Sequence, residues 1–541
     1  MADYNLVELV QRPAVFTPAL LAVAYIFYRL FLQPSKLPDL PVLNARKGEW
    51  FSHWRATWRN TKDFKAACLL ARTQYRDQAC IVPVLGAGNM VLLPAKNTKF
   101  VIDNPENVLS LHESAMDSLQ TDYTMGERLV REPVHHPLIT TTLTNQTGNL
   151  IPELADETQQ SLDSLWGTDT AEWRDVCVYT SLQKSIGRVT NRIFIGKPLC
   201  RDPELLRLGI AFAMDIPLGS QMLRLFPKFI RPLAASVLMI PNRLHQRAFF
   251  NVLRPTIEQR LRDYDERHKD PEKNKAMGPE PNDFLQWLVN QAKEMGDPYH
   301  MKASTLSLRV QILNFASIHT SSFAITGAII DLVASKKDII DELRDEIRTV
   351  LAAHGGHWNK RALAQMEKLD STFRESQRVN SFVTVGLGRR VVARGGVTTP
   401  EGLHIPRGNQ VCVPGYAMHH DPDVYEDPDE FRPFRFSDMR KRAEDEAAAG
   451  DANDKEAAQA SFLSRARKQW ATTTSDFLGF GHGRGACPGR FFAAAELKLM
   501  LAHLILNYDF EMLEKRPRNT WFALNRVPPM EQTIRVKRRE A

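Results

Sequence analysis

The sequence contains few cysteines, and none stands at the short spacings through which cysteines usually act together. Its 541 residues include six, with no Cys-x-x-Cys pair and no histidine at zinc-site spacing. This excludes a zinc-finger pattern and argues against a disulfide framework, which small secreted proteins use when their core is small. We therefore expect the chain to function in a reducing compartment.

Flexible linkers are also missing. After the first 50 residues no Gly/Ser-rich or low-complexity tract divides the chain, so we expect one large catalytic domain at 51–541. The net charge of +7 could indicate nucleic acid, but Lys and Arg are scattered rather than striped. We expect no nucleic-acid partner, and a basic face directed at anionic lipid or an acidic redox partner.

Charged residues are absent from 14 to 28, and apolar residues continue to 32 after Arg29. This approaches the ~20 residues that cross a bilayer. Asp3 and Glu8 precede it instead of a basic cluster, and no small-residue cleavage site follows, which favours an uncleaved anchor at 1–33 over a signal peptide. The bilayer would be contacted through 14–32.

The flanks of this span differ in charge. Arg29, Lys36, Arg46 and Lys47 follow it, whereas Arg12 precedes it. This asymmetry predicts a single-pass protein whose catalytic domain faces the cytosol. Prolines at 34, 38 and 41 then predict a stiff, extended hinge at 34–50.

The remaining chain is predominantly helical by its hydrophobic periodicity. Helices are predicted at 150–166, 255–267, 283–294, 306–333 and 337–352, a hairpin at 79–93, and strands at 390–393 and 410–413. The fold class is therefore mainly α with a small β part (α+β). A charged, alanine-rich insertion at 440–468 and the basic tail 535–539 are interpreted as solvated surface segments, with partner docking as the alternative for the insertion.

The most informative stretch runs from Phe480 to Arg490, Phe-Gly-His-Gly-Arg-Gly-Ala-Cys-Pro-Gly-Arg. Its glycines allow a loop that lies flat against a planar ligand, and Pro488 suits the first position of a following helix. Cys487 would then lie beside free amides and the positive end of a helix dipole, which lower a thiol pKa. The alternative is a glycine-rich turn with an inert, buried cysteine.

This stretch resembles the haem-binding loop of the cytochrome P-450 superfamily, Phe-x-x-Gly-x-Arg/His-x-Cys-x-Gly. Phe480, Gly483, Cys487 and Gly489 match, and Gly481 and Arg484 lie between them. The resemblance implies haem b with Cys487 as the axial ligand of the iron. It departs at Gly485, where the family usually has a basic residue that pairs with a haem propionate.

Charge is absent again from 310 to 330, which predicts a helix buried in the protein core rather than a second membrane span, because the stretch contains many polar residues. Within it, 316–321 reads Ala-Ser-Ile-His-Thr-Ser. This resembles the family's oxygen-activation motif, with Thr320 and Ser321 at the hydroxyl pair and His319 at the acid. The resemblance implies proton delivery by Thr320, and His319 as a relay or a structural partner. Capping or packing is the alternative for such a polar patch.

Glu375-Ser-Gln-Arg378 places a carboxylate and a guanidinium one helical turn apart. Alone the pattern carries little information, since about one or two are expected by chance in such a chain. Arg435 follows in Phe-Arg-Pro-Phe-Arg-Phe, and the family has these blocks in this order. The resemblance implies that Glu375, Arg378 and Arg435 form a buried brace for the haem loop.

The partner of the haem propionates is an open question. Arg389 and Arg390 follow the Glu-x-x-Arg helix where the family commonly supplies such a ligand, and Arg484 could swing across instead. His135 and His136 could serve the other side of the ring, with surface histidines as the alternative.

Together the blocks imply a membrane-anchored haem-thiolate monooxygenase with the cytochrome P-450 fold, of the fungal microsomal, secondary-metabolism type. No flavin or dinucleotide fingerprint is fused to it, so electrons from NADPH would arrive through a separate cytochrome P-450 reductase at the endoplasmic reticulum membrane. The substrate would be an apolar small molecule: terpenoid, steroid-like or polyketide. The alternatives are a haem-thiolate isomerase or dehydratase, and a haem-binding sensor without turnover.

Overall fold

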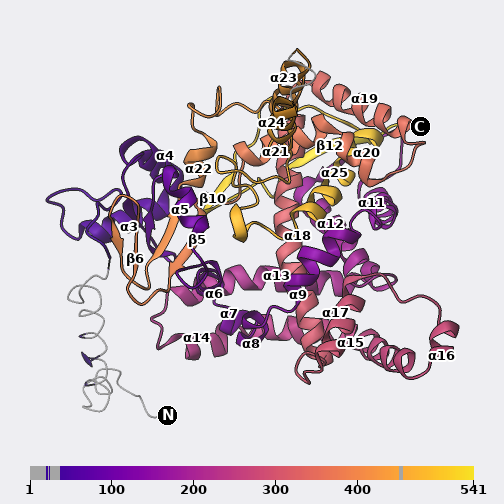
Figure 1. Cartoon of the computed structure of the whole chain (residues 1–541), viewed down its shortest axis with the longest axis horizontal. Helices are drawn as coiled ribbons and strands as arrows, with labels where there is room; N and C mark the ends of the chain where they lie inside the picture. Colours follow the sequence, from indigo (N-terminus) through magenta and orange to yellow (C-terminus); the bar gives the residue numbers. More distant parts are fainter. Residues whose placement is uncertain (1–16, 18–19, 22–23, 25–36, 450–454, 541) are drawn as a thin grey trace, which may run out of the picture.

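The computed structural model describes residues 17, 20–21, 24, 37–449 and 455–540. Apart from four isolated positions, the anchor predicted at 1–33 and the start of the predicted hinge at 34–36 lie outside this range. The described chain forms a large helical body, with β5 (Gly386–Val391) and β6 (Val397–Thr398) toward one side and β12 (Thr533–Arg538) among the helices of the other side (Figure 1). The predicted α+β class is confirmed.

Helices form most of the body. Their bounds are α3 Ser52–Lys62, α4 Phe64–Gln74, α5 Thr98–Asp103, α6 Leu111–Leu119, α7 Thr121–Thr124, α8 Glu127–Arg131, α9 His135–Pro137, α10 Thr144–Gln146, α11 Ile151–Trp166, α12 Val178–Phe194, α13 Pro203–Arg224, α14 Arg231–Leu238, α15 Ile240–Lys269, α16 Pro271–Ala276, α17 Phe284–Met295, α18 Ala303–Val333, α19 Lys337–Ala353, α20 Lys360–Gln365, α21 Glu367–Val379, α22 Gly415–His419, α23 Arg435–Ala449, α24 Lys455–Ala466 and α25 Arg490–Asn507. A π-helical segment, Leu138–Leu143, joins α9 to α10.

The core is built around α18, which packs against α12, α13, α15, α21 and α25. Among the described residues this helix alone is long and apolar enough to cross a membrane, but 72% of its most apolar stretch is buried inside the protein. A helix surrounded by other helices can be apolar on every face. The absence of charge from 310 to 330 therefore reflects burial in the core, as predicted.

The largest sheet has the strand order β1-β2-β8-β5-β3. Its strands are β1 Cys80–Val84, β2 Gly88–Leu92, β8 Gln410–Val413, β5 Gly386–Val391 and β3 Leu109–Ser110. The predicted hairpin is the antiparallel pair of β1 and β2. Val42, in the second half of the predicted hinge, bridges to Ile81 of β1, so this part of the hinge is tied to the sheet.

Three smaller sheets complete the β part. The first has the strand order β4-β12-β9, with β4 Arg174–Cys177, β12 Thr533–Arg538 and β9 Tyr508–Phe510. The second pairs β10 Thr520–Phe522 with β11 Asn525–Val527. The third pairs β6 Val397–Thr398 with β7 His404–Ile405. The basic tail at 535–539 was predicted as a solvated segment, but most of it lies within β12. Its Val536 is buried, and Arg538 pairs with Asp163 at 2.6 Å, whereas Arg535 is exposed.

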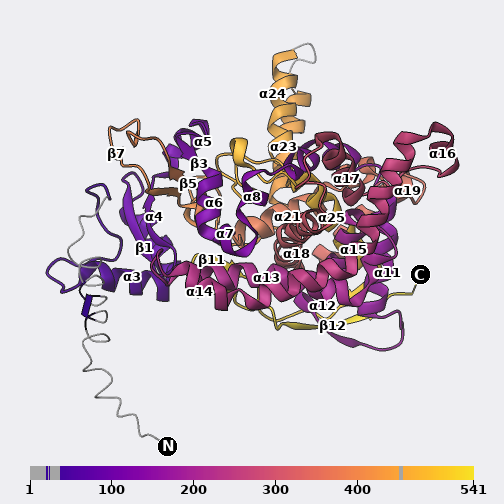
Figure 2. The ribbon, with the colours of Figure 1, turned by 90° about the horizontal axis from the view of Figure 1, so that it is seen from below.

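The predicted insertion forms two helices, α23 and α24, that pack against each other and project from the body (Figure 2). Helix α23 begins at Arg435, before the predicted start of the insertion, and its first turns are buried. Arg440 itself is 3% exposed and donates to the carbonyl of Glu367 at 2.7 Å. Residues 450–454, between the two helices, lie outside the described range.

Two predicted elements differ in extent from those observed. The predicted helix at 255–267 is the second half of α15, which continues through Pro255. The predicted strand at 390–393 is β5, which begins at Gly386; its two glycines concealed it, because glycine is depleted in strands. Arg389 and Arg390 therefore lie within this strand.

Candidate active site

The loop that carries Cys487 is folded back on itself. The amide of Cys487 donates to the carbonyl of Phe480 at 2.7 Å, and one 3₁₀ turn, Gly483–Gly485, lies between them. Gly481 and Gly483 have φ of 71° and 67°, a conformation that favours glycine. The turn therefore requires glycine at these two positions.

The start of α25 differs from the prediction. The helix begins at Arg490 with Gly489 as its N-cap, so Pro488 lies in the preceding turn. The amides of Gly489 and Arg490 still approach the Cys487 sulfur and lower the pKa of the thiol, but burial raises that pKa and is the larger effect. The predicted lowering by the helix start is thus outweighed by desolvation.

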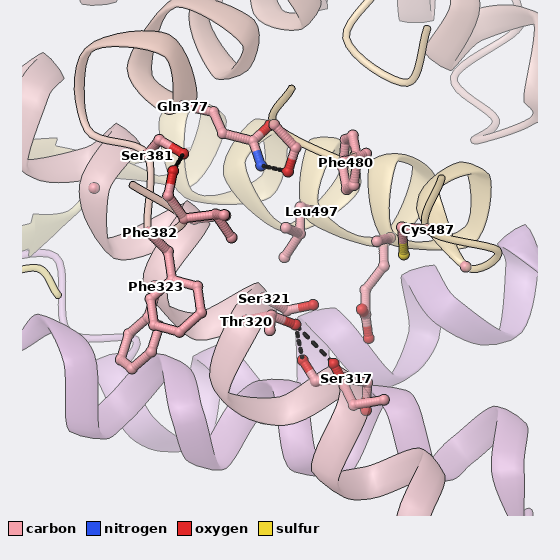
Figure 3. Close-up of a pocket in the computed structure, with 18 of the residues that line it drawn as sticks. Ser317, Thr320, Ser321, Phe323, Gln377, Ser381, Phe382, Phe480, Cys487 and Leu497 are labelled. Carbon is pink, nitrogen blue, oxygen red and sulfur yellow. Dashed lines mark hydrogen bonds between the residues drawn. The ribbon is translucent and has the colours of Figure 1, made fainter. Parts of the chain in front are cut away.

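Cys487 is exposed to a cavity of about 380 Å³ between α18 and α25. Figure 3 shows Cys487 on one wall, with Thr320 and Ser321 on the opposite wall. Apolar side chains line much of the space between these walls: Leu143, Phe194, Leu313, Phe323, Phe492 and Leu497. The cavity thus sets a thiol opposite a hydroxyl across an apolar gap.

Thr320 is exposed, and its hydroxyl donates to the carbonyl of Ala316 at 2.8 Å. A hydroxyl oxygen that donates its proton to the backbone keeps its lone pairs for other donors. Ser321, the second residue of the predicted hydroxyl pair, also lines the cavity. The helix therefore offers two hydroxyls on this side.

His319 does not line the cavity. Its Nδ1 lies 3.0 Å from the hydroxyl of Tyr179 and 3.2 Å from Nε2 of Gln183, both on α12. Burial lowers the pKa of His319 to about 4, so the ring is neutral near pH 7. Of the two predicted roles, this geometry fits the structural partner and not the relay.

Gly485, where the resemblance fails, has no room for a side chain. A Cβ built there would lie 2.5 Å from Nη2 of Arg389 and 2.9 Å from Leu111. Arg389 is 5% exposed, and no carboxylate of the described residues pairs with it within 4.0 Å. Burial lowers the pKa of this guanidinium, with Glu106 acting in the opposite direction. Arg389 therefore occupies the space next to the loop.

The two other arginine candidates differ. Arg390 pairs with Asp117 at 2.7 Å and donates to the carbonyl of Gly408. It does not share the surroundings of Arg389, because neighbouring residues of a strand point to opposite sides. Arg484 is exposed. Of the three, only Arg389 lies against Gly485.

The two histidines before the π-helical segment lie in different surroundings. His135 has a pKa lowered to about 3 by burial, so its neutral Nδ1 accepts from Nη1 of Arg309 at 2.9 Å. His136 is exposed and is not among the residues that line the cavity. The structure thus does not bring His136 to the site.

Glu375, Arg378 and Arg435 are brought together. Arg378 donates to both carboxylate oxygens of Glu375 at 2.8 and 2.9 Å, and Nε of Arg435 donates to Oε1 at 2.9 Å. The three residues are 0%, 0% and 6% exposed. The cluster joins α21 to the start of α23.

His419 connects this cluster to the cysteine loop, a role that sequence reasoning missed. Its carbonyl accepts from Arg378 at 2.6 Å, and its Nε2 accepts from the amide of Leu478 at 2.9 Å. The ring also stacks on Phe477. The sequence showed the His-His-Asp-Pro block but offered no signal for the direction of this ring.

Gln377 and Glu496 were also missed. Gln377 donates to the carbonyl of Gly479 at 2.9 Å (Figure 3) and accepts from the indole of Trp470 at 2.6 Å. Glu496 lines the cavity, accepts from Thr190 at 2.7 Å, and has its pKa raised to about 8 by burial. A helical Gln or Glu one turn from apolar residues carries no distinctive pattern.

Comparison with known proteins gives a consistent result. The profile of the cytochrome P450 family matches residues 107–533. Cytochrome P450 monooxygenase 151 of Postia placenta is 32% identical over 456 residues, covering 83% of this chain and 84% of that protein. Cytochrome P450 monooxygenase gloP of Glarea lozoyensis is 30% identical over 535 residues, covering 96% and 95%.

A solved structure titled "Retinoic acid bound cyanobacterial CYP120A1" has a TM-score of 0.62 to this chain at 18% sequence identity. The match covers 93% of this chain and 100% of that one. At this identity the likeness concerns the fold, and it confirms the architecture that the cysteine loop and the Glu-x-x-Arg block predicted.

Proposed function

The chain belongs to the cytochrome P450 family, and from this premise we propose that it inserts one oxygen atom of dioxygen into an apolar small molecule. The similar fungal proteins are named monooxygenases, which supports this reaction class. The single observation that carries the proposal is the cavity that sets Cys487 opposite Thr320.

The residues present fit a haem. The Cys487 thiol opens on an apolar cavity, and the buried guanidinium of Arg389 stands beside the loop with no ion-pair partner among the described residues. Cys487 would bind the iron, Arg389 would hold a propionate, and Phe480, Gly481 and Gly489 would shape the loop. Haem held by a thiolate supplies the activation of dioxygen, because the ligand donates electron density that favours O–O cleavage.

Thr320 would hold the water that delivers a proton for that reaction. Its hydroxyl donates to the carbonyl of Ala316, so its oxygen can accept a hydrogen bond from a water, and that water would pass the proton into the cavity. Ser321 lies next to it. His319, bonded to Tyr179, would keep α12 and α18 in register instead of moving a proton.

The cysteine loop needs rigid support, because the sulfur must stay in place through turnover. Glu375, Arg378 and Arg435 would provide it through the bonds from His419 to Leu478. A buried ion cluster fixes geometry more convincingly than it adds stability. We therefore assign these residues to the brace.

Electrons would come from NADPH through a separate reductase, as the resemblance implies. We place the protein at the endoplasmic reticulum membrane, catalytic body toward the cytosol. Exposed aromatic residues on and before α3, Trp50, Trp54 and Trp58, support contact with a bilayer surface, because tryptophan favours the membrane interface. Figure 2 shows α3 along the same edge of the body as α14, on which Leu233 and Val237 are exposed.

The substrate would be a terpenoid, steroid-like or polyketide compound of secondary metabolism. The organisms of the similar proteins are fungi, and the apolar walls of the cavity favour an apolar compound.

Carbon monoxide difference spectra of the full chain, reduced by NADPH and a reductase, test the proposal. We expect the red-shifted band of thiolate-ligated haem, its loss in Cys487→Ser, and its retention in the control Cys177→Ser, which changes a cysteine outside the cavity. A wild-type spectrum without this band, or a Cys487→Ser variant that keeps it, would overturn the assignment. Reductase-dependent gain of one oxygen by a product distinguishes monooxygenation from isomerisation and from haem sensing.

A further inference from the structure

One part of the cavity is polar. Asn380, Ser381, Arg516, Asn519 and Arg526 contribute to its lining, in contrast to the apolar walls near Cys487. In Figure 3 Ser381 and Phe382 lie at the end away from Cys487. This end, defined by the five residues, is called the polar end below.

The polar end has more cations than anions. Arg516 forms an ion pair with Asp331, which also accepts from Ser376 at 2.6 Å and from Asn380 at 2.8 Å. Asp331 is therefore already saturated with donors. Among the described residues no carboxylate pairs with Arg526 within 4.0 Å. One positive charge remains without a counter-charge.

Arg526 is held in place by neutral acceptors. It donates to the carbonyl of Val379 and, at 3.0 Å, to Oδ1 of Asn380. These bonds orient the guanidinium at the end of α21 but cancel no charge.

Asp331 and Asp429 act on Arg526 from a distance, but Asp331 already accepts from the donors named above, and the side chain of Asp429 is 82% exposed and thus screened by water. The rings of Tyr416 and Trp521 each lie 5.7 Å from this guanidinium and face it without carrying a charge.

A guanidinium withdrawn from water without an anion is costly, and buried charges are normally paired. The guanidinium of Arg526 lies next to the cavity. We propose that the substrate carries a carboxylate, and that Arg526 binds it at the polar end, with Asn519 as a further donor. This rests on the proposed function and names its substrate class: an apolar monocarboxylate.

The length of α18 sets the scale of such a substrate. Thr320 and Gly327 both line the cavity and are two helical turns apart, or about 10 Å at 1.5 Å per residue. A Cβ on Gly327 would lie 3.5 Å from Oγ of Ser376, which bonds Asp331. A substrate that spans this stretch of the cavity would be roughly 10 Å long.

Haem-binding imidazoles with an acidic tail test this without knowledge of the substrate. We would titrate the full-chain holoenzyme with ω-(imidazol-1-yl)alkanoic acids of graded chain length and with their methyl esters, and follow the spectral shift of imidazole ligation. At one chain length the acid should bind at least tenfold more tightly than its ester, because only the acid makes a charge-assisted bond. Equal binding at every length would overturn the proposal.

Variants give effects of opposite sign. Arg526→Gln should abolish the preference for the acid, and Arg526→Lys should keep part of it. Asp331→Asn removes a negative charge with little change of shape and should increase the preference for the acid over its ester. The control Arg535→Gln, a cation that is 51% exposed on β12, should leave it unchanged. A preference that persists in Arg526→Gln contradicts the assignment.

The carbon monoxide band separates this result from that of the proposed function. A variant that keeps the band is folded around its haem, so a lost acid preference then reports on Arg526 alone. If the wild-type band is present and no acid preference is found, only the carboxylate inference fails. If the band itself is missing, the proposed function fails.

Discussion

At the scale of single residues, the guanidinium of Arg389 lies in the space that a side chain at Gly485 would need. The backbone of Gly485 does not have a positive φ, so a side chain is disfavoured there by its neighbours: a Cβ would lie 2.5 Å from Nη2 of Arg389 and 2.9 Å from Leu111. We propose that Arg389 supplies from β5 the cation that the resemblance implies two residues before the cysteine. Glycine at 485 leaves room for this guanidinium.

We expect Arg389→Ala to release haem roughly 10- to 100-fold faster, because a charge-assisted hydrogen bond is worth about 1.5–3 kcal/mol. Haem transfer to apomyoglobin measures the rate. Adding Gly485→Arg to Arg389→Ala should restore much of the retention, since the vacated volume then accepts the new side chain. Arg390→Ala, which removes the pair with Asp117 and the bond to the carbonyl of Gly408, should retain haem like the wild type. An unchanged release rate in Arg389→Ala would contradict the role.

At the scale of elements, α21 connects the core to the cysteine loop. Its Glu375 and Arg378 face the start of α23, its Gln377 contacts Gly479, and Arg374 stacks over Phe477 at 4.0 Å. Successive turns of one helix therefore hold several parts of the loop. The loop position therefore depends on this helix as well as on its own glycines.

Glu375→Gln should destabilise the protein by about 3–5 kcal/mol, because two buried guanidinium groups lose their counter-charge. Thermal unfolding and haem content measure the effect. The chain contains a matched control, the exposed pair Glu204 and Arg207, which has the same i, i+3 spacing on α13. Glu204→Gln should leave the melting temperature nearly unchanged; equal effects of the two substitutions would contradict the role of burial.

At the scale of the whole molecule, burial shifts titratable groups in two directions. The pKa values of His135 and His419 are lowered to about 3, and those of His319 and His420 to about 4. Burial raises the pKa of Glu496 to about 8. In each case desolvation disfavours the charged form.

The stability of the protein should therefore be greatest near pH 6.5. Below pH 6.5 the histidines of the unfolded chain bind protons, whereas the buried histidines of the folded protein stay neutral. Each of them therefore lowers the free energy of unfolding by on the order of 1 kcal/mol by pH 5.5. Above pH 6.5 the folded state still holds the Glu496 proton that the unfolded chain has lost, so stability falls until about pH 8. Urea unfolding from pH 5.5 to 8 measures both sides.

Two variants separate these effects. His319→Gln should remove about one quarter of the fall in stability that the four histidines named above cause on the acid side, because the other three remain, and Glu496→Gln should flatten the alkaline side. A free energy of unfolding that is constant across this range would contradict the assignment of neutral buried histidines.

The sequence alone determined the residue types of the site and their order along the chain. Cys487 in its glycine turn and Thr320 in an uncharged helix were recognisable because local backbone geometry and burial leave marks on neighbouring residues. Helix α18, strand β8 and the first hairpin were predictable for the same reason. Strand β12 was not, because its burial comes from strands β4 and β9 that are distant in sequence.

Only the tertiary structure decided which side chains meet. It selected Arg389 over Arg390, turned His319 toward Tyr179, brought Arg435 to Glu375, and left Arg526 beside the cavity without an anion. Each of these depends on packing between segments far apart in the chain. Such packing fixes distances that no local pattern records.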